Sequence, residues 1–304
     1  MNGTLAKVTL PNVPLAKVTL AAFLLLSAAG TGLANAATLP GLPPGPLGQS
    51  IQRGHDMMMS STASPEMKRH VGNALNCSSC HINAGDTAAP GNFRETASKF
   101  PSFSAREGAV ITLEDRIANC FMRSMNGMRP STDNQLVVDM AAYIGWLDKG
   151  KPIETPPAPP SVPSPYPAML KAATHTDVVA GEAVYKANCA ACHGADGAGM
   201  PGAFPPVWGA GSYNAGAGLA NIAKLAIWVK GNMPLGNPHL TPQQAFQVAL
   251  YVDTQPRPDF VLSQHLPANE PADDYNASVR AETDSVASNL KKAGLPDSLL
   301  GTAN

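Results

Sequence analysis

Apolar positions recur at helical rather than strand spacing in the segments that carry most of the pattern. The stretch LVVDMAAYIGWL, residues 136–147, places five apolar side chains at the spacing of one face of an α-helix: Leu136, Val137, Met140, Ile144 and Leu147. A second stretch, TPQQAFQVALYV, begins with Thr241 as a predicted N-cap and Pro242 at the first helical position. We therefore expect an all-α fold.

The N-terminus has a different pattern, in which basic residues precede a continuous apolar run. Lys7 and Lys17 precede VTLAAFLLLSAAG, and Ala34-Asn35-Ala36 forms a small-residue cleavage site. We interpret residues 1–36 as a signal peptide that directs the chain to the periplasm. The alternative, an uncleaved membrane anchor, is disfavoured because the run is shorter than the ~20 apolar residues that span a bilayer. We expect no stable membrane insertion after cleavage.

A proline-rich segment divides the rest of the chain. In KPIETPPAPPSVPSPYP, residues 151–167, proline recurs too often for a helix or a central strand, which predicts an extended linker. The predicted parts are an N-terminal domain at 37–150, a C-terminal domain at 168–265 and a polar tail at 266–304. With 304 residues and a net charge of -1, the chain has room for two domains and no global charge suited to nucleic acid.

Each predicted domain contains one copy of the same cysteine motif. CSSCH spans residues 77–81 and CAACH spans residues 189–193. This spacing is typical of covalent haem c attachment, with two thiols bound to one porphyrin and the next histidine facing the iron. A disulfide or zinc site is the alternative for either pair, but two copies in one exported chain favour two covalently bound haem c groups. The attachment residues are Cys77, Cys80, Cys189 and Cys192, and the axial histidines are His81 and His193.

The motif and the later helix repeat together. Cys77 and Cys189 are 112 positions apart, and Tyr143 and Tyr251 are 108 apart. This predicts two tandem cytochrome c domains, each with an N-terminal helix that ends at its motif and a late helix that crosses it. In GEAVYKANCAACH we expect Gly181 where two helices touch.

The second domain offers a methionine as the sixth ligand of its iron. Met233 precedes Pro234 in WVKGNMPLG, and a His/Met pair raises the potential of a haem. Met200 is too near His193 to reach the opposite face, whereas Lys230 is an alternative ligand.

For the sixth ligand of the iron in the first domain, two possibilities remain open. Domain symmetry favours Met125 or Met128, with Cys120 as a spare thiol. An unpaired thiol in an oxidising compartment instead favours Cys120 as the iron ligand. Arg116, one turn earlier, and Arg106 would bind an oxyanion beside it.

Several first-domain and second-domain segments resemble one family. LNCSSCH, FPSFSAREGAVITLEDRIANCFMRSMNG and AAYIGWL, with FPPVWGAGSYNAGAG and NMP, are similar to the dihaem thiosulfate dehydrogenases, also called tetrathionate synthases. The resemblance covers residues 54–253, and R-I-x-x-C-x-x-R-S-x-N-G is its most specific part. It implies that His81 and Cys120 ligate the first haem, that Arg106 and Arg116 line the substrate pocket, and that Met233 ligates the second haem. Some members have lysine directly before that methionine, where this chain has Asn232.

The implied reaction joins two thiosulfate ions into tetrathionate and releases two electrons. Haem two would be the electron exit to an external acceptor, such as a small cytochrome c or another periplasmic redox protein. The main alternative is a non-enzymatic two-domain electron carrier with His/Met ligation at both haems. A third is a subunit that accepts electrons from another sulfur enzyme. We expect Arg123 to pair with a haem propionate or to bind anion, and five histidines to lie at the surface: His55, His70, His175, His239 and His265.

Overall fold

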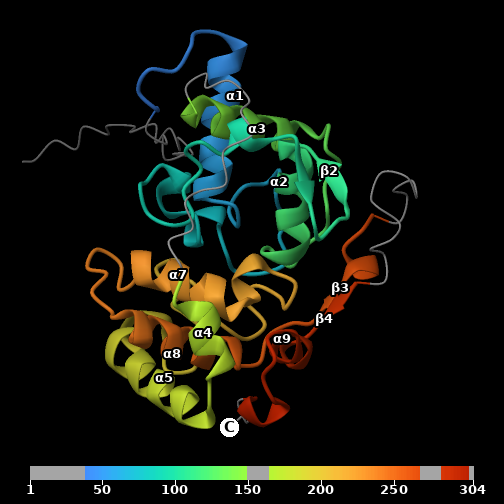
Figure 1. Cartoon of the computed structure of the whole chain (residues 1–304). Helices are drawn as coiled ribbons and strands as arrows, with labels where there is room; N and C mark the ends of the chain where they lie inside the picture. The colour runs from blue at the N-terminus through green and yellow to red at the C-terminus, as the bar shows by residue number, and fades with distance from the viewer. Residues whose placement is uncertain (1–37, 149–163, 268–281, 301–304) are drawn as a thin grey trace, which may run out of the picture. The chain divides into compact units, whose positions relative to one another are not determined.

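The first domain is a set of helices built around the crossing of its first and last members. The computed structural model describes residues 38–148, 164–267 and 282–300. The main helices of the first domain are α1 (Pro46–Met59), α2 (Leu113–Arg123) and α3 (Gln135–Leu147). Helix α1 crosses α3 at Gly54, where an added Cβ would lie 2.1 Å from the carbonyl oxygen of Asp139. Only glycine permits this approach, so the crossing depends on one residue (Figure 1).

The second domain repeats this crossing. Its helices are α4 (Tyr166–Lys171), α5 (His175–Asn188), α6 (Ala190–His193), α7 (Ile222–Asn232) and α8 (Pro242–Asp253). A Cβ on Gly181 of α5 would lie 2.0 Å from the carbonyl oxygen of Gln247 in α8. The predicted helices, the N-cap at Thr241 and the role of Gly181 are therefore confirmed.

The two domains differ in how the first helix meets the haem motif. In the second domain α5 ends at Asn188, directly before Cys189, as expected. In the first domain α1 ends at Met59, well before Cys77, so that expectation is wrong there. The Ser61 hydroxyl bridges the gap, because it donates to the Met57 carbonyl at 2.9 Å and accepts from the Cys77 amide at 3.0 Å.

Helix α2 follows a short antiparallel ribbon, β1 (Ser102–Ser104) with β2 (Ala109–Ile111). Thr112 and Asp115 form a capping box at its start, with the Thr112 hydroxyl accepting from the Asp115 amide at 3.1 Å. The ribbon and the capping box fix the start of α2, and they thereby fix the position of Cys120 on that helix.

Residues 282–300 of the C-terminal tail pack with the second domain. Strand β4 (Thr283–Asp284) pairs with β3 (Phe260–Val261), and helix α9 (Val286–Lys292) follows. Leu290, Leu295 and Leu299 join the hydrophobic core that contains α7 and α8. The tail therefore contributes apolar packing, which its polar composition did not reveal.

Segments on either side of the linker also contact each other. The described residues from 38 onward belong to one compact unit, and the Trp228 indole of α7 donates to the Cys80 carbonyl at 2.8 Å. The signal segment and residues 151–163 of the expected linker lie outside the described residues, but Tyr166 and Pro167 already form the first turn of α4. Among the described helices, none is long and apolar enough to cross a bilayer.

Candidate active site

The first haem motif lines a cavity of about 250 Å³. Cys77 lies in a 3₁₀ turn, Cys77–Ser79, that begins at Asn76, and Cys80 and His81 follow it. All three motif side chains face the cavity, together with apolar side chains of α1, α2 and α3: Met58, Ile117, Phe121, Met140 and Ile144. An apolar cavity with two thiols and an imidazole on one wall fits a covalently held porphyrin.

Both motif histidines are oriented by a backbone carbonyl. His81 Nδ1 lies 2.6 Å from the Gly91 oxygen, and His193 Nδ1 lies 2.8 Å from the Pro205 oxygen. A carbonyl accepts only from a protonated Nδ1, so Nε2 of each ring is the nitrogen left for a metal. The same arrangement in both domains is what haem ligation requires.

Burial keeps the motif side chains neutral. It lowers the pKa of His81 to about 4 and raises that of Cys77 to about 11 and that of Cys80 to about 12. All five cysteines are free thiols. Across the described residues, no three His, Cys, Asp or Glu side chains gather into a metal site.

Cys120 lies on α2 and lines the same cavity as His81. The Arg116 guanidinium, one helical turn earlier, donates from Nη1 to Cys120 Sγ at 3.1 Å. The helix is held from its other side by buried polar contacts, in which Asn119 accepts from Arg129 at 3.1 Å and donates to Glu107 at 3.2 Å. The thiol and one of the two predicted arginines are therefore brought together as expected.

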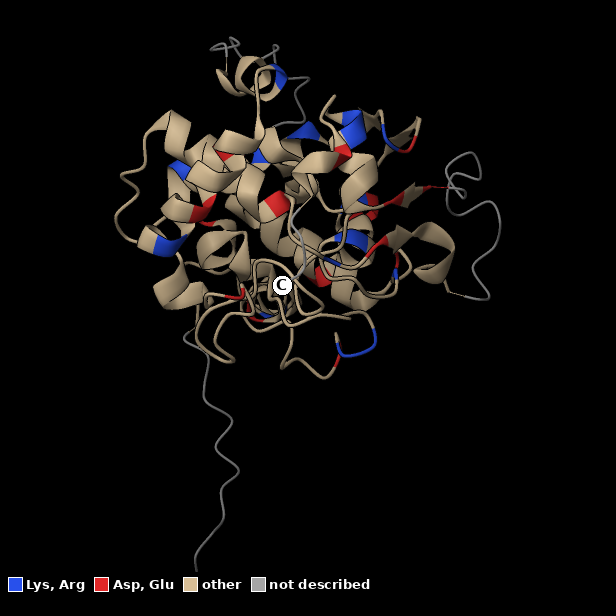
Figure 2. Cartoon of the chain, turned by 90° about the horizontal axis from the view of Figure 1, so that it is seen from below, with Lys and Arg blue, Asp and Glu red and all other residues tan. Residues whose placement is uncertain are grey.

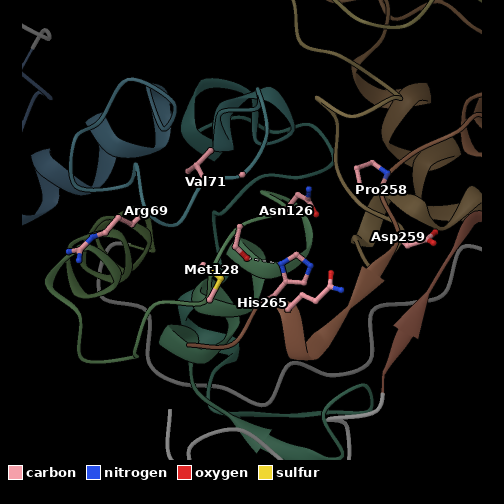
Figure 3. A pocket seen from close by; sticks show the side chains of 10 residues that line it. Arg69, Val71, Asn126, Met128, Pro258, Asp259 and His265 are labelled. Carbon is pink, nitrogen blue, oxygen red and sulfur yellow. Dashed lines mark hydrogen bonds between the residues drawn. The ribbon is translucent and has the colours of Figure 1, made fainter. Parts of the chain in front are cut away.

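The two methionines considered as alternatives to Cys120 lie in different places in the structure. Met125 lines the haem cavity, but Met128 does not. Met128 instead borders a second pocket of about 390 Å³ with Arg69, Asn126 and His265 (Figure 3). Cys120 and Met125 remain as the candidates for the face opposite His81.

Arg106 does not line the haem cavity. Its Nη1 donates to the Gly216 carbonyl of the second domain at 2.8 Å. Although the side chain is exposed overall, desolvation by neighbouring groups lowers its pKa, and the charge of Arg123 adds to this effect. Arg106 is thus a cation fixed at the contact between the two domains.

Arg123 differs from our expectation, because protein carboxylates already surround it. It is buried, its Nη2 lies 2.7 Å from Glu282 of the tail, and its Nη1 lies 3.8 Å from Glu107. The guanidinium also stacks on Phe260 at 4.9 Å. These contacts give Arg123 a structural role that links α2 to the tail.

His265 also departs from expectation, since it is buried rather than at the surface. Its ring stacks on Phe260 and its Nδ1 lies 2.8 Å from the Gly127 carbonyl. This packing could not be predicted from local sequence, because Phe260 and Gly127 contact His265 only in the folded chain.

At the second motif, Cys189 and Met233 border the same hydrophobic cluster, which includes Tyr185, Trp208 and Leu240. Met233 directly follows α7 and caps it. Met200 is exposed and its amide pairs with Phe204, whose ring contacts His193. This arrangement keeps Met200 on the histidine side and favours Met233 for the opposite face.

Sequence reasoning missed the residues of α7 that touch the first domain. Besides the Trp228 contact, the Asn232 amide donates to the Pro90 carbonyl at 3.0 Å. The four-residue spacing of Trp228 and Asn232 is visible in the sequence, but the residues they contact are not.

Basic and acidic residues are interspersed over the elements (Figure 2).

Comparisons with known proteins agree with the two-domain arrangement. Residues 68–153 match the family described as "SoxA/TsdA, cytochrome c domain", and residues 176–252 match "Cytochrome C oxidase, cbb3-type, subunit III". The thiosulfate dehydrogenase of Allochromatium vinosum is 41% identical over 231 residues, which are 72% of this chain and 82% of that protein. The thiosulfate dehydrogenase of Thiomonas intermedia is 34% identical over 71% of this chain and 69% of that protein.

A solved structure has the same fold. It is the "as isolated" form of the thiosulfate dehydrogenase TsdBA from Marichromatium purpuratum, with a TM-score of 0.63 and 32% identity. The match covers 72% of this chain and 48% of that one, so the chain spans about half the length of this relative.

Proposed function

The chain belongs to the thiosulfate dehydrogenase family, and we propose that it couples two thiosulfate ions into tetrathionate at the cavity that contains Cys120. It is an oxidoreductase with two covalently bound haem c groups. The observation that carries the proposal is the 3.1 Å contact between Arg116 Nη1 and Cys120 Sγ in the cavity of the first haem motif. A cation beside a thiol suits a site for anionic sulfur.

The residues that would hold the haems follow from the two motifs. Cys77 and Cys80 would attach the first haem, and His81 and Cys120 would ligate its iron. Cys189 and Cys192 would attach the second haem, and His193 and Met233 would ligate its iron. When bound, the two haems supply two one-electron acceptors, which matches the two electrons that the coupling releases.

Cys120 is the nucleophilic centre of the proposed reaction. Its thiolate bonds to the outer sulfur of one thiosulfate and gives a Cys120 S–S–sulfonate adduct. This bond requires the removal of two electrons, which the haems would accept when bound. The outer sulfur of a second thiosulfate then attacks the substrate-derived sulfur of this adduct. The new S–S bond completes tetrathionate, and Cys120 departs again as a thiolate, so atoms and charge balance.

The arginines offset the repulsion between the substrates. Two unit charges 4 Å apart repel by about 1 kcal/mol in water and by about 4 kcal/mol at an effective dielectric of 20. Each thiosulfate has two negative charges, so the approach of two dianions multiplies this cost. Arg116 at the cavity and Arg106 near it provide fixed positive charge that binds the sulfonate groups.

We further propose that the enzyme works in the periplasm after removal of residues 1–36, that electrons leave through the second haem, and that a small cytochrome c or another periplasmic redox protein accepts them. The attachment of both haems to an exported chain supports this arrangement. Oxidation of thiosulfate is the proposed direction.

The test is thiosulfate-dependent reduction of an artificial one-electron acceptor by the protein with both haems attached, with tetrathionate quantified. We expect wild-type turnover and loss of turnover in Cys120→Ala, with full haem content. Met125→Leu is the matched control, because Met125 lines the same cavity. It should retain turnover and Cys/His ligation in spin-resonance spectra.

The same variants test the electron-carrier alternative. If Met125 ligated the first haem, Met125→Leu would change the spectrum of that haem and Cys120→Ala would not. Wild-type protein that formed no tetrathionate, combined with that spectral result, would refute the proposed enzyme.

A further inference from the structure

One face of α7 packs on the first domain next to its haem motif. Lys224, Trp228 and Asn232 are four residues apart, and this spacing places them on the same side of the helix. Trp228 donates to the Cys80 carbonyl and Asn232 to the Pro90 carbonyl. A Cβ on the neighbouring Gly231 would lie 2.5 Å from Pro90 Cδ, so the packing is close. Lys224 is the N-terminal member of this face.

A second contact draws the start of α7 toward the predicted substrate arginines. Arg106 donates to the Gly216 carbonyl, and Gly216 lies in the loop that leads through the turn Gly218–Ala220 into α7. Desolvation lowers the pKa of Lys224, and the positive charges of Arg106 and Arg116 lower it further. The three cations are therefore gathered from two domains.

The position of Lys224 is not explained by helix stability or by ion pairing. It lies in the first turn of α7, where the helix dipole disfavours a positive charge. Within the described ranges, Lys224 forms no ion pair with an aspartate or glutamate, whereas Lys186 of α5 pairs with Glu182 at 2.6 Å. The carboxylates of Glu107, Glu282 and Asp284 act on Arg106. The charged groups that act on Lys224 are the two arginines, which repel it unless an anion joins them.

We infer that Lys224 is a third substrate-binding residue, which joins Arg106 and Arg116 in holding the sulfonate groups of thiosulfate beside Cys120. This inference rests on the proposed function, since it takes thiosulfate as the anion. Two thiosulfate ions have four negative charges, and two arginines balance only half of them. A third cation from the second domain brings the site closer to neutrality when both substrates are present.

The test measures binding without turnover. Protein with both haems, kept reduced with ascorbate so that no thiosulfate is oxidised, is dialysed to equilibrium against ³⁵S-thiosulfate. We expect Lys224→Gln to weaken binding about tenfold, since a hydrogen bond to a charged group is lost. Lys224→Arg should restore most of the affinity. The control Lys186→Gln removes the same charge from an exposed position of the same domain and should bind as wild type does.

Each outcome has a distinct meaning. A Lys224→Gln protein that binds thiosulfate as wild type does would overturn the inference, and so would equal losses in Lys224→Gln and Lys186→Gln. Haem content and the Soret spectrum show that each variant is folded. Failure of the proposed reaction is visible separately, as wild-type binding without tetrathionate formation in the turnover assay.

Discussion

The crossing of α1 and α3 gives the sharpest structural prediction, because the close approach of the helices requires that Gly54 have no Cβ. Replacing Gly54 by alanine would place a Cβ 2.1 Å from the carbonyl oxygen of Asp139, 2.6 Å from its carbonyl carbon and 3.0 Å from the Met140 amide nitrogen. All three atoms belong to the backbone of α3, so no flexible side chain can move away. The helices must separate.

The expected cost follows from two opposing effects. Overpacking of a close contact costs about 1–3 kcal/mol, and a purely backbone clash falls at the upper end. Alanine returns about 1 kcal/mol over glycine within a helix. The net loss is about 2 kcal/mol, which lowers the Tm of a domain of this size by roughly 8 °C. Because α3 supplies Met140 and Ile144 to the haem cavity, the spectrum of the first haem should change as well.

Thermal unfolding followed by circular dichroism, together with the Soret bands of both haems, provides the assay. Gly145→Ala is the matched control, since Gly145 also lies on α3 and a Cβ there meets nothing within 4 Å. That variant should gain stability and keep both spectra. A Gly54→Ala protein with the wild-type Tm would refute the reasoning that this contact limits helix approach.

Two further variants probe buried charges near the same helices. The Asp139 carboxylate is buried, which raises its pKa, but hydrogen bonds from three side chains outweigh this effect and leave the pKa lowered: Ser50, Arg53 and Gln135. The ionised carboxylate stabilises the fold above the unfolded pKa of about 3.9, and this stabilisation is lost as pH falls through the lower folded pKa. In urea unfolding, Asp139→Asn should lower the free energy of unfolding by about 1–3 kcal/mol at pH 7. This difference should shrink below pH 4. Glu282→Gln should cost about 3 kcal/mol in the same assay, because it leaves the buried Arg123 with less compensating charge; wild-type stability would show that the tail contact contributes nothing.

The sequence predicted those features whose chemistry is local. Two C-x-x-C-H motifs indicate the covalent cofactor and the histidines proposed to face each iron, because the groups that react with the porphyrin lie within five consecutive residues. Arg116 and Cys120 are four residues apart on a helix, so their contact follows from helix geometry alone. Gly181 was predictable because close helix crossings require glycine.

Other features depend on partners that are distant in the chain. Met125 and Met128 look equivalent in sequence, yet only Met125 reaches the haem cavity, since the chain turns away after α2. Arg123 has the charge to bind a propionate, but Glu282, 159 residues later, takes that position. The tail is polar on average, and only its folded path shows that Leu290 is part of a core.

Helix α7 connects the separate parts of the proposed mechanism. Lys224 begins the face that contacts the first domain, Trp228 donates to the carbonyl of the haem-attaching Cys80, and Met233 follows the last turn. A helix rises ~1.5 Å per residue, so the nine steps from Lys224 to Met233 span about 14 Å. A rigid element of this length sets the distance between the proposed substrate site and the proposed ligand of the second haem. In the proposed mechanism the second domain would therefore contribute to the chemistry at Cys120 as well as to electron exit, because the same helix that precedes Met233 contains Lys224.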